Sequence, residues 1–189
     1  MCQEDRMYVV TNEKVVLERD IKGNRVLDIG GGGEGIIGLS YGSKVVAIDQ
    51  RKEELEEAPE GPLKLVMDAR ELTFLDNSFD TVTSFFTLMY VKKEEHEKVL
   101  SEIYRVLKNH GAFILWDATI PKYDNSIKDI FVIQLEIDTP TKLIKTGYGV
   151  LRKDKEQNIE HFINIGKKVG FNIVKEEKGE HIFKIIFKK

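Results

Sequence analysis

The hydrophobic pattern of the chain predicts short buried strands that alternate with helices. Runs rich in β-branched and aliphatic residues recur along its first two thirds and end at glycine, a small residue or a carboxylate. These predicted strands are Arg25–Gly30, Lys44–Asp49, Pro62–Ala69, Phe79–Leu88 and Ala112–Ala118. Helical segments separate them, so the connections are crossovers. We therefore predict a parallel sheet in an α/β sandwich of the Rossmann-like kind.

The helices are predicted from apolar residues spaced three and four positions apart. In Glu94–Gly111 the apolar positions fall on one face, and Gly111 is expected to end the helix. Glu53–Ala58 is a short acidic helix that Pro59 terminates, and Glu156–Phe171 contains one further helix that ends at Gly170.

The last third of the chain follows a different pattern. Asp129–Arg152 alternates apolar and polar residues on both sides of Thr139–Lys142, which predicts an antiparallel hairpin. Phe171–Lys189 contains two strands around a turn near Gly179. We expect one domain, 1–189, with a seven-stranded, mostly parallel sheet, an antiparallel last strand and an inserted hairpin or lid at about 123–153.

Composition narrows the class of protein. The chain has 189 residues, 29 Lys and Arg, 32 Asp and Glu and a net charge of −3, so no basic excess points to a nucleic-acid binder. Its one cysteine, Cys2, and a charged start without a signal peptide predict a cytoplasmic protein; no apolar run approaches the length of a membrane span. The four histidines are scattered, so no metal site is expected, and His96 is expected to be solvated.

The segment Val26–Gly38 contains six glycines and follows a predicted strand. Gly30, Gly32 and Gly35 match the G-x-G-x-x-G pattern, and Asp49 lies about twenty residues further on, as in dinucleotide-binding proteins. An NAD-dependent oxidoreductase is therefore one hypothesis. Asp28, however, is a carboxylate among aliphatic residues, and the helix after the glycines is short. Asp28 and Asp49 together favour a ligand with an ammonium group and a ribose, such as S-adenosylmethionine (SAM).

From Asn24 to Asp117 the chain resembles class I SAM-dependent methyltransferases, in the type 11 group that includes quinone C-methyltransferases. The segment VLDIGGGGEG resembles the first motif of the family, VVAID the second strand, and VMDARELTFLDNSFDTVTSFFTLMYV the third and fourth motifs. The first motif departs from D-x-G-x-G-x-G, because Glu34 occupies the place of the third glycine.

The resemblance implies a cofactor site at the ends of the predicted strands. Asp28 and the glycines would hold the amino-acid part of SAM, Asp49 the ribose, and Asp68 with Ala69 the adenine. The full predicted set is Asp28, Gly30, Gly32, Gly33, Asp49, Gln50, Asp68, Ala69, Ser84 and Phe85.

The sequence indicates the residues that would contact the methyl acceptor less clearly than those of the cofactor site. Tyr90, Tyr123, Tyr148 and Asp117 are candidate acceptor contacts, and the catalytic residues are unknown because no side chain stands out as a general base. The hairpin is expected to be an acceptor lid, a cover of the core or a homodimer interface. Three hypotheses remain: a SAM-dependent methyltransferase acting on a small molecule, an NAD-dependent oxidoreductase, and a SAM-binding partner or regulatory protein without catalysis.

Overall fold

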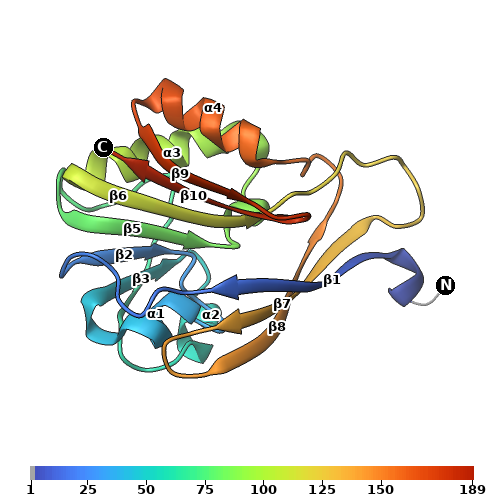
Figure 1. Ribbon diagram of the computed structural model, residues 1–189, viewed down its shortest axis with the longest axis horizontal. Coiled ribbons are helices and arrows are strands. Elements are labelled where there is room, and N and C mark those ends of the chain that lie inside the picture. The colour runs from blue at the N-terminus through green and yellow to red at the C-terminus, as the bar shows by residue number, and fades with distance from the viewer. Residues whose placement is uncertain (1–2) are drawn as a thin grey trace.

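A seven-stranded sheet forms the centre of the computed structural model, which describes residues 3–189 and leaves Met1 and Cys2 outside the description (Figure 1). The strand order is β4-β3-β2-β5-β6-β10-β9. Its strands are β2 (Val26–Ile29), β3 (Val45–Asp49), β4 (Leu63–Val66), β5 (Phe79–Phe85), β6 (Leu107–Ala118), β9 (Asn172–Lys178) and β10 (Ile182–Lys188).

The directions of the strands confirm the predicted fold class. Neighbouring strands from β4 to β6 are parallel, whereas β10 runs antiparallel to both β6 and β9. All four residues of β2 are buried, which explains why this strand reads as a continuous apolar run interrupted only by Asp28.

Helices and a second sheet cover the two faces of the central sheet. On one face, α3 (His96–Val106) and α4 (Ile159–Val169) bury side chains such as Leu100 and Phe162 against β5, β6 and β10 (Figure 1). On the other face lie α1 (Ile36–Tyr41) and α2 (Lys52–Glu57). Short 3₁₀ turns complete the chain: η1 (Gln3–Arg6), η2 (Gly42–Lys44), η3 (Leu88–Tyr90) and η4 (Lys93–Glu95). None of the helices within residues 3–189 is long and apolar enough to cross a membrane.

The second sheet has three strands in the order β1-β7-β8. β7 (Ile130–Asp138) and β8 (Leu143–Leu151) form an antiparallel pair where the sequence predicts a hairpin. The sequence pattern predicts no element at β1 (Met7–Val16), which pairs in parallel with β7. Phe131 and Ile133 of β7 point into the core on the α1 side of the central sheet.

Two local predictions are wrong. The helix α3 ends at Val106 instead of Gly111, because the chain from Leu107 onward pairs as β6 and the ammonium of Lys189 donates to the Leu107 carbonyl (2.8 Å). His96 is buried rather than solvated: only 2% of its surface is exposed. Its Nδ1 lies 2.9 Å from His161 Nε2, and its Nε2 lies 3.0 Å from the Leu88 carbonyl oxygen.

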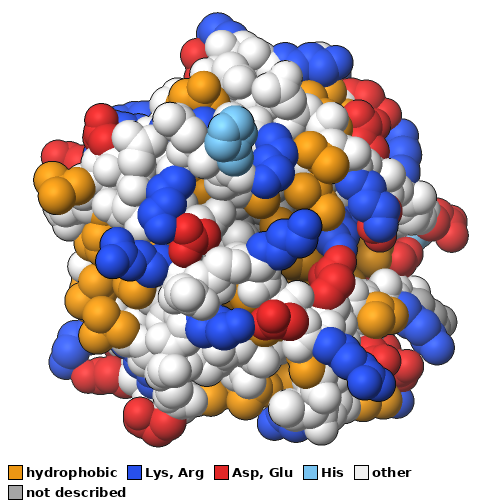
Figure 2. All heavy atoms as spheres, turned by 60° about the vertical axis from the view of Figure 1, so that its left-hand side comes forward, with side chains coloured by type: hydrophobic (Ala, Val, Ile, Leu, Met, Phe, Trp, Pro, Cys, Tyr) orange, Lys and Arg blue, Asp and Glu red, His pale blue; other side chains and the backbone are white. Residues whose placement is uncertain are grey.

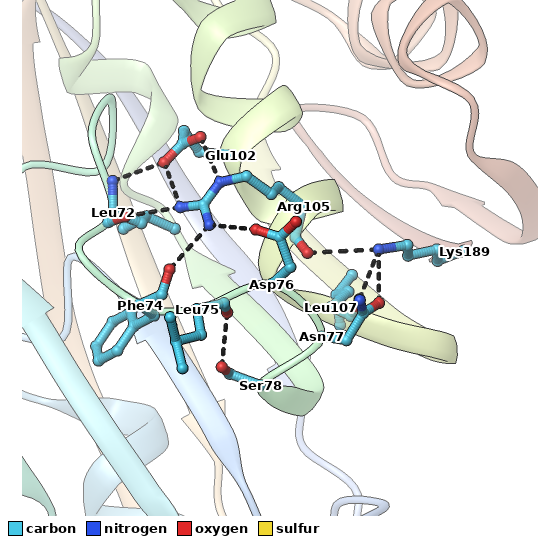
Figure 3. Close-up of polar contacts among 10 residues, drawn as sticks. All are labelled: Leu72, Phe74, Leu75, Asp76, Asn77, Ser78, Glu102, Arg105, Leu107 and Lys189. Atoms are coloured by element: carbon cyan, nitrogen blue, oxygen red, sulfur yellow. Dashed lines mark hydrogen bonds and ion pairs between the residues drawn. The ribbon is translucent and has the colours of Figure 1, made fainter.

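A network around Arg105 fixes the loop between β4 and β5 (Figure 3). The guanidinium donates to the carbonyls of Leu72 and Phe74 (2.7 and 2.8 Å) and pairs with Asp76 and Glu102. Glu102 in turn accepts the Leu72 N–H (2.8 Å). Four of these contacts tie this irregular loop to α3, and the Arg105–Glu102 pair lies within the helix itself.

Candidate functional site

A cavity of about 670 Å³ opens at the carboxyl ends of β2, β3 and β5, beside the strand of the second sheet that carries Tyr148. β2 is bonded to β3 on one side and to β5 on the other, so the strand order reverses at this point. Ligands of open α/β sheets bind in the crevice outside such a reversal. The volume is ordinary for a cofactor pocket.

Asp28 is the buried acid of the cavity. Only 2% of its surface is exposed, and its Oδ1 accepts a hydrogen bond from the Thr83 hydroxyl at 2.8 Å. Burial raises the pKa of Asp28 to about 7; the Thr83 bond works against the shift, and the nearby Asp49 carboxylate adds to it. A cation bound at this carboxylate would remove much of the cost of burying its charge.

The glycine loop lies tightly against the carboxylates. A Cβ on Gly31 would come within 2.8 Å of Asp28 Oδ2, and one on Gly32 within 3.1 Å of Asp49 Oδ2 and 2.5 Å of the Glu54 Cβ. Both positions therefore require glycine. Glu34, which replaces the third glycine of the family motif, accepts a hydrogen bond from the Thr146 hydroxyl of β8.

Most amide hydrogens of this loop already have partners. Gly30 and Gly31 both donate to the Ile48 carbonyl (2.8 and 2.9 Å), Gly33 to the Glu54 carbonyl (2.8 Å) and Gly35 to the Gly32 carbonyl (3.1 Å). A pyrophosphate needs free N–H groups at the start of a helix. The loop and the six-residue α1 behind it offer few of them, so the site fits a dinucleotide poorly.

Further acids follow β3 and β4. Asp49 ends β3, and its Oδ1 accepts the Arg51 N–H at 2.8 Å. Asp68, after β4, holds the guanidinium of Arg70 through Nε (2.9 and 3.0 Å) and Nη2 (2.6 Å). That guanidinium holds the pKa of Asp68 below its usual range.

Aromatic side chains form the opposite wall. Phe86 has a left-handed backbone (φ 50°), and its ring stacks on that of Tyr148 with centroids 5.6 Å apart. Burial strongly raises the pKa of Tyr148 and raises that of Tyr90 to about 12. Both hydroxyls are therefore protonated at neutral pH and do not act as bases.

The cavity brings together most of the residues predicted from the sequence. Those that line it are Asp28, Gly30, Gly32, Gly33, Asp49, Gln50, Asp68, Ala69, Phe85, Tyr90 and Tyr148.

Ser84 and Asp117 are not among the lining residues. Ser84 is buried in β5, and its hydroxyl has no hydrogen-bond partner among the described residues. Asp117 is fully buried at the end of β6, where it accepts hydrogen bonds from Gln157 (2.7 Å) and the Met89 N–H (3.2 Å). Burial raises the pKa of Asp117 to about 7. It supports η3 from behind the cavity.

Sequence reasoning missed several lining residues. Arg70 directly follows the predicted Asp68 and Ala69, so proximity was a usable signal. No sequence signal pointed to Glu54 or Glu95, because each reaches the cavity from a charged surface segment. Gly147 and Gly149 of β8 could not be predicted as lining residues, because they reach the cavity only through the way the second sheet lies against the first.

Comparison with known proteins shows which family the central part of the chain resembles. The pattern of the family described as "Methyltransferase domain" matches residues 27–115, from β2 to β6. Residues 27–115 thus match a methyltransferase domain, and the relatives and structural neighbours support a class I SAM-dependent methyltransferase. The matched family and the neighbours indicate SAM as the cofactor, and the NAD-dependent alternative is not favoured.

Curated relatives match over this same part of the chain. A phosphatidylethanolamine N-methyltransferase from Cereibacter sphaeroides is 36% identical over 104 residues, which are 50% of each chain. A demethylmenaquinone methyltransferase from Bacteroides fragilis is 32% identical over 108 residues, 57% of this chain and 43% of the relative. The chain thus aligns with about half the length of the curated relatives it matches.

Solved structures share the fold across most of the chain. A SAM-dependent methyltransferase from Methanosarcina mazei has a TM-score of 0.63 and 21% identity, covering 92% of this chain and 94% of its own. The [4+2]-cyclase SpnF has a TM-score of 0.64 and 15% identity, covering 88% of this chain and 74% of its own. Since a protein described as a cyclase has the same fold, the fold alone does not specify the reaction.

The site fits SAM on its own geometry. Two carboxylates stand at the ends of adjacent strands, and only glycine can fill the space beside each of them. SAM carries an ammonium group and ribose hydroxyls, which are suitable partners for two such acids.

Proposed function

We propose that this chain transfers the methyl group of SAM to a small-molecule acceptor. The observation that carries the proposal is the pairing of Asp28 and Asp49 across the glycine loop, with Asp28 buried among aliphatic residues. In this proposal Asp28 holds the ammonium group, Asp49 the ribose hydroxyls, and Asp68 with Ala69 the adenine. Gln50, Phe85 and the glycines at 30, 32 and 33 complete the cofactor side.

SAM supplies an electrophilic methyl group on a sulfonium. The chain has to align the acceptor with that group and keep water away from it. The stacked rings of Phe86 and Tyr148 and the side chain of Tyr90 form an apolar wall suited to both tasks. No base is assigned, so the proposal favours an acceptor whose nucleophilic atom is already deprotonated, or becomes so through solvent.

The β7–β8 hairpin is proposed to cover the acceptor. Gly147, Tyr148 and Gly149 of β8 line the cavity, and the same three residues line a shallow hollow on the outer face of the second sheet. Met7, Ile130 and Val132 make that hollow largely apolar. An acceptor could therefore approach along the outer face and enter beside the two glycines, where no side chain obstructs the backbone.

The relatives support an acceptor that is a small molecule. The names of the two reported above specify phosphatidylethanolamine and demethylmenaquinone. The surface is consistent with this class, because Lys and Arg side chains alternate with Asp and Glu on the face shown in Figure 2 and form no continuous basic patch there.

The proposal is tested by label transfer. The purified chain is incubated with methyl-labelled SAM and fractionated small-molecule extracts, and products are separated from unreacted SAM. Label in at least one fraction, lost in the Asp49→Ala variant, supports the proposal. SAM binding without transfer to any fraction would instead support a binding protein without catalysis, and absence of SAM binding would overturn the cofactor assignment as well.

A further inference from the structure

Arg70 bridges two separate segments of the cavity wall. Its Nε and Nη2 hold Asp68 on the loop after β4, and its Nη1 donates to Glu95 of η4 at 2.6 Å. All three side chains line the cavity and are partly exposed: 36% of Arg70, 39% of Asp68 and 28% of Glu95. The bridge therefore spans the end of the cavity where Asp68 lies.

The two carboxylates fix the plane of the guanidinium. They engage its in-plane N–H donors on two sides, so these hydrogen bonds leave the flat faces of the group unused. A guanidinium held in this way offers a planar, weakly hydrated surface that stacks well on aromatic rings. A lysine at this position would supply the charge without the plane.

We infer that Arg70 is a cofactor-binding residue whose guanidinium face packs against the adenine ring. The inference rests on the proposed cofactor site, in which Asp68 and Ala69 contact adenine. Gln50 and Met67 line the cavity as well, so they can contribute the rest of the adenine wall. Glu95 is then a positioning residue, because it acts on the ring only through the orientation of Arg70.

The competing explanation is that Arg70 merely ties the loop to η4. In that case its replacement would lower thermal stability and leave ligand preference unchanged. Binding of adenosine, which contains the adenine and ribose but neither the methyl group nor the amino acid, separates the two explanations.

The experiment measures adenosine and SAM affinity by calorimetry for the wild type, Arg70→Lys, Arg70→Met and Glu95→Gln, with a melting curve for each. Loss of the planar group is expected to weaken adenosine binding about tenfold in both Arg70 variants, since stacking on a cation is worth that much when partly desolvated. Glu95→Gln should give a smaller loss, about threefold, because one edge of the guanidinium stays held by Asp68. Lys98→Met is the control: it removes a positive charge that acts on Asp68 from α3, outside the cavity, and should leave adenosine affinity unchanged.

The outcomes separate this inference from the proposed function. Wild-type binding of SAM, with adenosine affinity in Arg70→Met within twofold of the wild type, overturns the role of Arg70 alone. Full recovery of affinity in Arg70→Lys overturns the stacking and leaves a charge effect. Failure of the wild type to bind SAM overturns the proposed site and this inference together. If Arg70→Met does not fold, the Glu95→Gln and Lys98→Met pair decides: equal adenosine affinities in the two contradict the inference.

Discussion

The hydroxyl of Thr146 in β8 donates a hydrogen bond to the carboxylate of Glu34 in the glycine loop. The two residues are 112 positions apart in the chain: Thr146 belongs to the three-stranded sheet, and Glu34 lies in the loop that follows β2 of the seven-stranded sheet. Glu34 is the residue at which the loop departs from the family motif. The departure thus has a structural counterpart: it connects the proposed cofactor loop to the proposed acceptor cover.

This contact predicts coupled effects on SAM release. Glu34→Gln and Thr146→Val are each expected to speed SAM dissociation about threefold, because the first removes the charge that strengthens the bond and the second removes its donor. The double variant should be no faster than either single one, since all three changes act on the same bond. Stopped-flow displacement measures the rates. Thr141→Val, in the turn of the same hairpin, serves as a control with wild-type kinetics. Additive effects of Glu34→Gln and Thr146→Val would show that the contact does not act as a unit.

Gly30 and Gly42 separate the effect of space from that of backbone strain. Both have a positive φ, of 72° and 63°, so alanine strains the backbone at each by at least about 1 kcal/mol. Only at Gly30 does the new Cβ meet an obstacle, 2.2 Å from Thr87 Cγ2 and 2.8 Å from Thr87 Cβ. We expect Gly42→Ala to lower stability without changing SAM affinity, and Gly30→Ala to lower both. Denaturant unfolding measures the stability, and calorimetry measures the SAM affinity. Equal SAM affinities of Gly30→Ala and Gly42→Ala would show that the close packing at Gly30 is not needed for SAM binding.

The pH dependence of SAM binding follows from Asp28. With a pKa of about 7 in the free protein, Asp28 is mostly protonated at pH 6 and must lose its proton to pair with an ammonium group. Lowering the pH from 7.5 to 6.0 should therefore weaken SAM binding about eightfold, which is the change in the ionised fraction. Asp28→Asn should bind weakly with little pH dependence over this range.

Asp117 is the matched control for that titration. Its pKa is also raised to about 7 by burial, but it does not line the cavity. Asp117→Asn should keep the pH dependence of SAM binding. For the stability of the free protein the sign is opposite: each buried acid favours folding in its protonated form, a contribution fully present below the pKa of an unfolded aspartate and lost as the pH rises through about 7.

The Arg105 network predicts a stability effect. Arg105→Met removes the donors to the Leu72 and Phe74 carbonyls and both ion pairs, so the free energy of unfolding should fall by about 2 kcal/mol. Denaturant unfolding measures it. Lys52→Met breaks the exposed pair with Glu56 and should leave the unfolding midpoint unchanged. A midpoint for Arg105→Met equal to that of the wild type would mean that the loop does not depend on this network.

The sequence predicts the inner strands of the central sheet well because they are buried on both faces. Val26–Ile29 and Val45–Asp49 read as strands from composition alone, and their terminal acids could be placed at one edge once the strands were taken as parallel. β1 was missed, since its partner β7 lies more than 120 residues away and nothing local indicates the pairing. His96 was misplaced for the same reason: its partner His161 comes from α4.

The residues of the candidate site, too, could be predicted from the sequence only in part. Asp28, Asp49 and Asp68 could be found because each follows or interrupts a predicted strand. Arg70 and Glu95 can be recognised as site residues only from the structure, which places η4 beside the loop after β4. Ser84 was predicted from its place near the end of β5, but strand alternation separates it from its neighbour Phe85, which does line the cavity.

The most direct test of the account is a pair of calorimetric titrations of the wild-type chain, one with SAM and one with NAD. We expect saturable binding of SAM with one site per chain, lost or weakened at least tenfold in Asp49→Ala, where a hydrogen-bonded charge contact to the ribose is removed. No saturable binding of NAD is expected in the same range. Binding of NAD without binding of SAM would contradict the central claim.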